Sequence, residues 1–275
     1  MSLVEPGDTG TVGPVSVKRA KRSYAMLRTV GALVLREMST SYGRKPGGYI
    51  WAIIQPLGTI LVLAFAFSLL QKTPSLGTSF VLFKATGLLM FQMFRSIQRM
   101  VSASLSYSSA LLVYPGVTWI DAVFARFLLN GMVSVLVAVL ILSGDIVIEQ
   151  LWLIYDWVLI VEAVALTLLL ALGIGMLTCY LSERFEIFNN IWNMFTTPLM
   201  LSSGVLYLYD GLPKFAKDVL WYNPLVHVIG MMRAGFYSTY HPQYLSATFV
   251  MLCGLVPLVL GLLLLRRHHR DLLTR

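Results

Sequence analysis

Charged residues are scarce in this sequence. Lysine, arginine, aspartate and glutamate make up 12 % of the 275 residues, whereas apolar residues make up 57 %. Roughly a quarter of the residues of a soluble domain are charged, so this composition excludes an ordinary soluble domain. Several apolar runs approach the ~20 residues that a helix needs to cross a bilayer, and the ~10-residue alternating segments of an outer-membrane barrel are missing. We therefore expect a helical membrane protein.

The sequence also lacks common enzyme motifs. Without G-x-x-x-x-G-K-[ST], the chain has no P-loop to hold nucleotide phosphates. H-E-x-x-H, G-x-S-x-G and zinc-like spacings of cysteine and histidine are missing too. Cys179 and Cys253 lie in apolar runs, where we expect small buried thiols. We predict no catalytic residue, metal site or cofactor in this chain, so another polypeptide, carrying ATP and magnesium, must hydrolyse any ATP that drives it.

Six apolar segments are predicted to span the membrane. They are Ile50–Leu70, Phe80 to about Leu105, Trp119–Leu142, Leu153–Tyr180, Ile187 to about Leu208, and Leu245–Leu265. Of the 21 lysine and arginine residues, eight precede the first segment and four follow the last, which predicts cytoplasmic termini. The loop Ser143–Gln150 has acids but no lysine or arginine and is predicted to be external. The net charge of +8 then fits anionic lipid, and no aromatic-basic platform for nucleic acid is evident.

Three segments outside the spans are expected to carry function, namely residues 24–45, 107–118 and 209–244. Residues 1–23 lack the pattern of a cleaved signal peptide and are predicted to be a disordered cytoplasmic tail. Residues 24–45 have apolar residues at helical spacing and predict an amphipathic helix in the cytoplasmic interface, either contacting a partner or acting only as an anchor. Within the span-containing domain, 46–275, residues 107–118 form a cytoplasmic loop. Residues 209–244, rich in aromatic residues, are predicted to form external re-entrant helices.

Ionisable residues within spans are the remaining candidates, because charge in lipid is costly and usually marks a pair, a cavity or a pathway. Lys84 is predicted to extend to the outer interface. Arg95 and Arg99 share one helix face. They could line an inward-open cavity and bind a phosphate. Alternatively, Arg95 could pair with an acid such as Glu162 or extend toward the cytoplasmic interface.

Asp121 and Arg126 lie near the predicted cytoplasmic end of the third span. They are five residues apart and so do not share an ideal helix stripe. We expect each to pair with a neighbouring cytoplasmic element, for instance Arg126 with Glu183 or Glu186. The preceding Tyr114-Pro115-Gly116 predicts a break in the helix at this point.

Four separated segments resemble the permease subunits of ABC-2 exporters, particularly those of the KpsM type that export capsular polysaccharide. The resembling segments are Arg36–Leu57 with GGYIWAIIQPL, Gly87–Pro115 with GLLMFQMF and LLVYP, Glu183–Tyr207 with ERFEIFNNIW and SSGVLY, and Tyr222–Phe236 with YNPLVHVIGMMRAGF. Together they cover most of residues 36–236. Glu186 stands where the family commonly has an aspartate, a change that we expect to be tolerated.

The resemblance implies an all-α membrane protein of six spans with the ABC-2, or type V ABC exporter, fold. It further implies a homodimer in the bacterial inner membrane, with a channel at the dimer interface and two cytoplasmic ATPase subunits. The cargo would be lipid-linked capsular polysaccharide, and periplasmic and outer-membrane capsule export proteins would be further partners. O-antigen, teichoic acid or a small drug-like cargo remains an alternative. So do a membrane enzyme acting on lipid phosphates and a structural scaffold.

The resemblance also suggests roles for particular residues. The predicted sets are the headgroup path Arg44, Lys45, Arg95 and Arg99; the channel aromatics Trp192, Phe195, Tyr207, Tyr209, Tyr222 and Phe236; and the ATPase-coupling residues Tyr107, Leu111, Leu112, Tyr114, Pro115 and Arg184. The aromatic pairs Tyr207 with Tyr209 and Tyr222 with Phe236 would suit sugar rings. Aromatic residues also anchor helices at membrane interfaces without any ligand.

Overall fold

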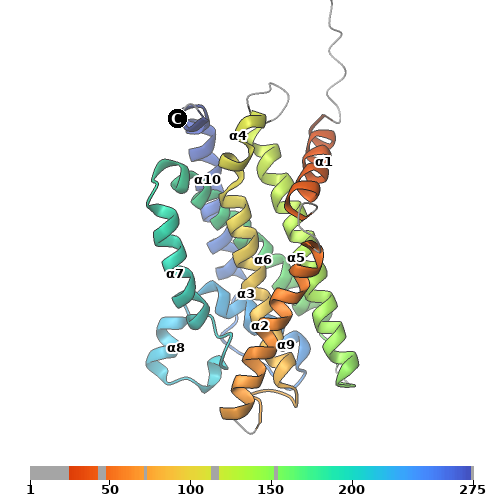
Figure 1. Ribbon diagram of the computed structural model, residues 1–275. Coiled ribbons are helices and arrows are strands. Elements are labelled where there is room, and N and C mark those ends of the chain that lie inside the picture. Colours follow the sequence, from red (N-terminus) through yellow and green to blue (C-terminus); the bar gives the residue numbers. More distant parts are fainter. Residues whose placement is uncertain (1–24, 43–47, 71–72, 113–117, 152–153, 274–275) are drawn as a thin grey trace, which may run out of the picture.

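The computed structural model describes residues 25–42, 48–70, 73–112, 118–151 and 154–273, and its helices form one bundle (Figure 1). Over these residues every regular element is helical. The helices are α1 Ala25–Glu37, α2 Gly48–Leu70, α3 Phe80–Ser102, α4 Ser104–Leu112, α5 Trp119–Ile148, α6 Trp157–Arg184, α7 Phe188–Ser202, α8 Lys214–Leu220, α9 Pro224–Phe236 and α10 Ala247–Leu273, with a π-helical turn at Met38–Tyr42 and a 3-10 turn at Tyr209–Gly211.

Five of the described helices are long and apolar enough to cross a membrane, namely α2, α3, α5, α6 and α10. The predicted fifth span, Ile187–Leu208, is shorter than expected because α7 ends at Ser202. Its 15 residues extend about 22 Å, less than the ~30 Å of hydrocarbon. Gly204, with a φ of 76°, stops the helix soon after Ser202. A full count of six spans therefore stays a prediction.

Other predicted boundaries are also wrong, and α6 and α10 end at Arg184 and Leu273 rather than at Tyr180 and Leu265. The third span was expected to end at Leu142, yet α5 continues to Ile148, so most of the predicted loop Ser143–Gln150 is helical. The helix continues because residues 143–148 contain only one glycine and no proline to stop it. The second span was expected to reach about Leu105, but α3 ends at Ser102 and α4 begins two residues later.

The core of the bundle is α3, which is buried around most of its circumference from Leu82 to Phe94 and packs against α5, α6 and α9. The most extensive helix pair is α6 with α10. There the backbones meet closely, because a Cβ atom at Gly173 would collide with the carbonyl of Gly254. Glycine at such a crossing lets two helices approach where lipid offers no hydrophobic driving force.

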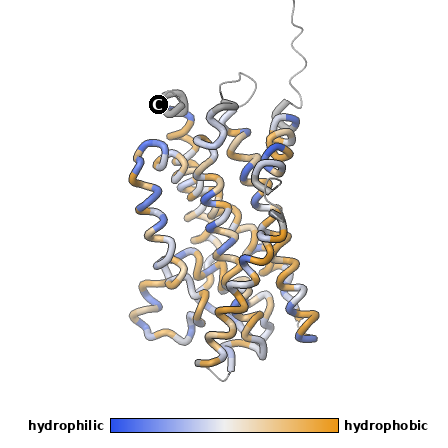
Figure 2. The backbone as a smooth tube through the Cα atoms, in the orientation of Figure 1, coloured by the Kyte–Doolittle hydropathy of each residue, from blue (hydrophilic) through white to orange (hydrophobic). Residues whose placement is uncertain are grey.

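The ends of the bundle differ. In Figure 1, α1, α4 and the C-terminal end of α10 lie at one end, and α8 and α9 lie at the other. The end with α1 is the one predicted to be cytoplasmic, and this orientation stays a prediction. Figure 2 shows that α2 is mostly hydrophobic, whereas α7 carries hydrophilic residues along its length. The helices α8 and α9 lie within the predicted external segment 209–244, and their depth in the membrane also stays a prediction.

Candidate functional site

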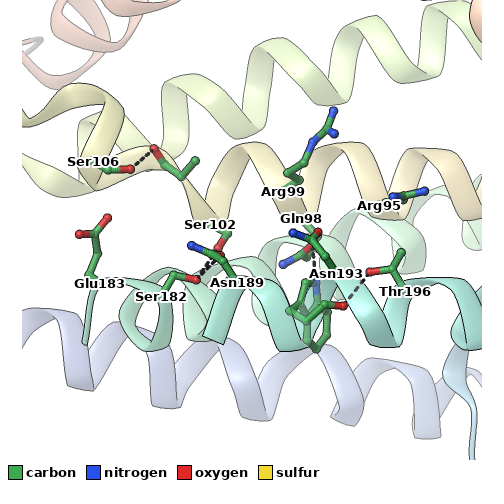
Figure 3. Close-up of a pocket in the computed structure, with 12 residues that line it drawn as sticks. Arg95, Gln98, Arg99, Ser102, Ser106, Ser182, Glu183, Asn189, Asn193 and Thr196 are labelled. Carbon is green, nitrogen blue, oxygen red and sulfur yellow. Dashed lines mark hydrogen bonds between the residues drawn. The ribbon is translucent and has the colours of Figure 1, made fainter. Parts of the chain in front are cut away.

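A polar groove lies between α3 and α7, with a cavity volume of about 260 Å³ (Figure 3). It is lined by Arg95, Gln98, Arg99, Ser102, Ala103 and Ser106, by Ser182 and Glu183 at the end of α6, and by Asn189, Trp192, Asn193 and Thr196 on α7. On both α3 and α7 the lining residues recur at intervals of three and four, which places them on one face of each helix. Two polar helix faces therefore oppose each other.

The helix α7 is turned with its polar face inward. Within this helix, all of which is described, Thr196 is the buried residue. The apolar side chains Met194 and Phe195 point away from the groove face and are 76 % and 64 % exposed. An exposed apolar face on a membrane helix is compatible with lipid or with another subunit. The groove itself is formed by groups that bind water or polar ligands.

Hydrogen bonds cross the groove at two levels. The indole nitrogen of Trp192 donates to Oε1 of Gln98 at 3.0 Å, and Nε2 of Gln98 donates to Oγ1 of Thr178 at 2.8 Å. One turn nearer the α1 end, the Ser182 hydroxyl donates to Oδ1 of Asn189 at 2.7 Å. The groove face of α7 is thus attached to α3 and α6 through polar contacts.

The groove carries more positive than negative charge. Arg95 and Arg99 are exposed, and among the described residues neither makes a hydrogen bond or ion pair, so the alternative pairing of Arg95 with Glu162 is not formed. Glu183 is the acid in the groove lining. Two guanidinium groups beside amides and hydroxyls could bind an anionic group together with neighbouring hydroxyls. Arg44 and Lys45, the other residues of the predicted headgroup path, lie outside the described residues.

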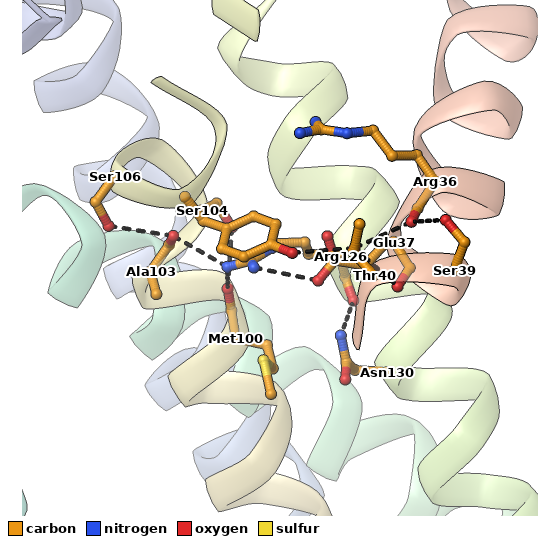
Figure 4. Close-up of polar contacts among 11 residues, drawn as sticks. Arg36, Glu37, Ser39, Thr40, Met100, Ala103, Ser104, Ser106, Arg126 and Asn130 are labelled. Atoms are coloured by element: carbon orange, nitrogen blue, oxygen red, sulfur yellow. Dashed lines mark hydrogen bonds and ion pairs between the residues drawn. The ribbon is translucent and has the colours of Figure 1, made fainter. Parts of the chain in front are cut away.

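A buried junction lies beside the groove, around Arg126 of α5 (Figure 4). The guanidinium donates from Nη2 to Oε1 of Glu37 at 3.1 Å and from Nη1 to the carbonyls of Met100 and Ala103 at 3.2 and 3.0 Å. The Arg126 and Glu37 side chains are 5 % and 8 % exposed. The two carbonyls lie where α3 ends and α4 begins, so one cation holds α1, α5 and the α3–α4 break together.

Tyr107 extends this junction to α4. Its ring lies against the guanidinium of Arg126, 3.9 Å from the ring centroid to Cζ, and its hydroxyl donates to Oγ1 of Thr40 at 3.0 Å. A face-on cation and ring attract each other electrostatically. The predicted ATPase-coupling residue Tyr107 therefore joins α4 to the turn that follows α1. Sequence reasoning missed Glu37 and Thr40, although Glu37 is the one acid in the predicted interface helix.

The predicted partners of Arg126 are wrong. Neither Glu183 nor Glu186 pairs with it, because Glu37 of the N-terminal helix occupies that side of α5. Asp121 also has a different role from the expected pair with a neighbouring element. Its carboxylate accepts from the backbone and hydroxyl of Thr118, and the Thr118 hydroxyl accepts from its backbone, which together form a capping box at the start of α5.

The remaining predicted coupling residues are only partly within the described part of the chain. Leu111 and Leu112 end α4, and their side chains lie outside what the structure describes, as do Tyr114 and Pro115 entirely. Arg184 is the exposed last residue of α6. Their contact with an ATPase stays a prediction.

The turn after α7, residues 205–207, is held by two buried cations. Arg233 donates to the carbonyls of Tyr207 and Val205 at 2.9 and 3.0 Å. Lys84 donates to the carbonyl of Leu206 at 2.7 Å and lies 3.5 Å from the ring centroid of Phe67. The prediction that Lys84 extends to the interface is wrong, since its side chain is buried. A carbonyl-rich turn close to Lys84 offered hydrogen bonds that sequence spacing did not reveal.

The same place joins three of the motifs that carry the family resemblance. A Cβ atom on Gly87 would lie 3.0 Å from the Arg233 guanidinium, and Asn223 donates to the Ser202 hydroxyl at 3.1 Å. Asn223 also caps the first turn of α9. Residues from α3, the turn after α7, and α9 thus form one anchor, which gives these motifs a structural role.

The predicted channel aromatics lie in several environments. Trp192 lines the groove, Phe195 lies on the opposite face of α7, and Tyr207 is half-buried in the turn after it. Tyr209 and Tyr222 line a second pocket of about 330 Å³ beside α8, and Phe236 is 6 % exposed.

Neither predicted aromatic pair is formed. Tyr209 packs on Tyr244, Tyr222 meets Trp221, and Phe236 meets Tyr155 edge-on. Tyr209 and Phe236 pair with rings from distant parts of the chain, which spacing does not reveal, whereas Tyr222 meets its neighbour in the sequence. A role of these aromatics in a channel stays a prediction.

Comparison with known proteins places this architecture in a family. The model of the ABC-2 type transporter family matches residues 28–237. The chain is 30 % identical over 243 residues to the capsule polysaccharide export inner-membrane protein CtrC of Neisseria meningitidis serogroup A, covering 88 % of this chain and 92 % of that protein.

Two further relatives match along nearly their whole length. The polysialic acid transport protein KpsM of Escherichia coli is 29 % identical over 246 residues, which are 90 % of this chain and 95 % of that protein. The capsule polysaccharide export inner-membrane protein BexB of Haemophilus influenzae is 26 % identical over 251 residues, which are 91 % and 95 %. The chain therefore belongs to the ABC-2 type transporter family.

Proposed function

We propose that the chain is the permease subunit of an ATP-driven exporter that moves lipid-linked capsular polysaccharide across the bacterial inner membrane. The observation that carries this proposal is the similarity to two capsule polysaccharide export inner-membrane proteins and a polysialic acid transport protein over about 90 % of each chain. The family match over residues 28–237 includes the groove and the anchor after α7. The permease does no chemistry itself, and its role is to provide a path for the polymer.

The energy would come from a separate ATPase. The chain has no P-loop, and we propose that two copies of it bind two cytoplasmic ATPase subunits. The Arg126 junction supports this arrangement, because it ties α4 and α1 rigidly to the spans α3 and α5. Movement of a partner against α4 would then reach the membrane through α3 and α5. Both termini would face the cytoplasm, and periplasmic and outer-membrane capsule export proteins would receive the polymer.

The groove is proposed to receive the lipid headgroup or the first sugars. Arg95 and Arg99 supply positive charge, and the amides and hydroxyls opposite supply hydrogen bonds to sugar hydroxyls. Arg44 and Lys45 would extend this path toward the cytoplasmic surface. A membrane enzyme acting on lipid phosphates is a weaker candidate, because the described lining of the groove has a single acid and no histidine to act as a general base.

Deletion of the gene tests the proposal in cells. We expect polymer to be synthesised but to accumulate in the cytoplasm, and surface polymer to return when the gene is restored. Deletion of the partner ATPase gene is the matched control and should give the same distribution. Normal surface polymer without this chain would contradict the proposal, as would a failure of polymer synthesis itself.

A further inference from the structure

Gln98 ties three helices together by using both ends of its amide. The indole nitrogen of Trp192 can only donate, so the amide oxygen of Gln98 must face α7, where the two atoms are 3.0 Å apart. The NH₂ group then faces α6 and donates to Thr178, whose hydroxyl donates in turn to the carbonyl of Gly175 at 3.1 Å. The chemistry of these groups fixes the orientation of the amide. Gln98 itself is 2 % exposed.

Near Trp192, α7 is attached by hydrogen bonds whose partners can be replaced by water or by a polar ligand. Apolar side chains such as Met194 and Phe195 face away from α3, so they do not interlock α7 with the groove. The polar contacts here are two neutral hydrogen bonds, which Trp192 donates to Gln98 and Asn189 accepts from Ser182. A neutral hydrogen bond contributes little net stability when water or a polar ligand can replace the partner. Separation of this half of α7 from α3 therefore costs little free energy at these contacts.

The last residue of α7, Ser202, accepts a hydrogen bond from Asn223, and the turn that follows is attached more firmly. The three carbonyls of residues 205–207 accept charge-assisted hydrogen bonds from Arg233 and Lys84, both buried. Between this anchor and Trp192 lies Pro198, which has no N–H to donate to the carbonyl of residue 194 and so weakens the helix there. The chain is thus held firmly after α7, the helix is weakened at Pro198, and the half that bears Trp192 is held by exchangeable bonds. This arrangement lets that half rotate about Pro198.

We propose that Gln98 is a positioning residue that holds α7 in a closed position, and that the half of α7 bearing Trp192 swings away from α3 about Pro198 during the transport cycle. The bond from Trp192 to Gln98 breaks in this movement, and water or hydroxyls of the passing polymer take over the freed groups. The link of this movement to transport rests on the proposed function. The movement itself is a property of the chain and its ATPase.

A thiol reporter at the buried position of α7 tests the movement. Thr196→Cys is placed in a chain carrying Cys179→Ala and Cys253→Ala, and its reaction with a membrane-impermeant methanethiosulfonate is timed in the complex with the ATPase, in lipid nanodiscs. Gln98→Leu should raise the labelling rate about fivefold to tenfold, the factor expected for one lost neutral hydrogen bond. Trp192→Phe keeps an aromatic ring and should have the same effect. Both changes together should add little to either one, because they remove the same bond.

Asn193→Cys is the matched control, since this side chain is already exposed in the groove and should label equally fast with or without Gln98→Leu. With Gln98 intact, trapping the ATPase with vanadate should raise labelling at position 196. Unchanged labelling in Gln98→Leu and Trp192→Phe would overturn the proposal, as would fully multiplicative effects. If Gln98→Leu fails to assemble, Trp192→Phe and the vanadate experiment decide. If labelling responds in a complex that moves no polysaccharide, the proposed function is refuted, whereas the proposed role of Gln98 in holding α7 still stands.

Discussion

Removal of Glu37 tests the junction at the end of the bundle that carries α1. Glu37→Ala leaves Arg126 buried without its carboxylate, 3.1 Å away in the native chain. Breaking a buried pair by removing one partner costs about 3–5 kcal/mol. Arg126 still donates to the carbonyls of Met100 and Ala103, so part of this loss is avoided, and we expect about 2–3 kcal/mol.

The loss can be measured as thermal stability of the purified chain in detergent. For chains of this size 1 kcal/mol corresponds to roughly 2–4 °C, so Tm should fall by roughly 4–12 °C. Arg36→Ala is the matched control, since the neighbouring Arg36 side chain is exposed and should leave Tm unchanged. Glu37→Gln keeps an oxygen acceptor and should lie between the two. A Tm for Glu37→Ala equal to that of Arg36→Ala would refute the view that this ion pair holds α1 to α5.

Three other substitutions test other parts of the structure. Arg95→Ala should lower polymer export several-fold while the complex stays assembled, because it removes a cation from the groove; unchanged surface polymer would exclude Arg95 from the path. Three alanines in place of Tyr114-Pro115-Gly116 should uncouple ATP hydrolysis from export or prevent ATPase binding, and wild-type values of both would contradict the coupling role of this segment. Gly173→Val should lower the stability of the chain by at least about 1–3 kcal/mol through overpacking against the Gly254 carbonyl, measured as Tm, whereas Gly144→Val, at a position with open space, should change it little.

The helical membrane fold was predictable because hydrocarbon thickness and backbone hydrogen bonding leave few alternatives. A run such as Ile50–Leu70 has to be a helix if it crosses a bilayer, and α2 covers it almost residue for residue. Boundaries were less predictable where a local signal competed with the apolar pattern. Gly204 ends the predicted fifth span early, and α5 runs past its predicted end because no helix breaker follows Leu142 directly.

The contacts of the charged residues were only partly predictable. Helical spacing was sufficient to place Arg95 and Arg99 on one face, because both residues belong to α3 and the geometry of one helix sets their relative direction. The partner of Arg126 could not be predicted, because the side of α5 that α1 covers is set by tertiary packing. For the same reason the prediction that Lys84 extends to the outer interface was wrong. Its burial depends on a turn 122 residues further along the chain.

Reconstitution tests the central claim most directly. The chain and its ATPase would be placed in proteoliposomes with the ATPase outside, and lipid-linked capsular polysaccharide would be supplied in the outer leaflet. We predict that the polymer becomes protected from an added polysaccharide lyase, that protection requires ATP, and that it is lost when the ATPase is inactivated. ATP hydrolysis without any protected polymer would contradict the assignment of this chain as a capsular polysaccharide permease.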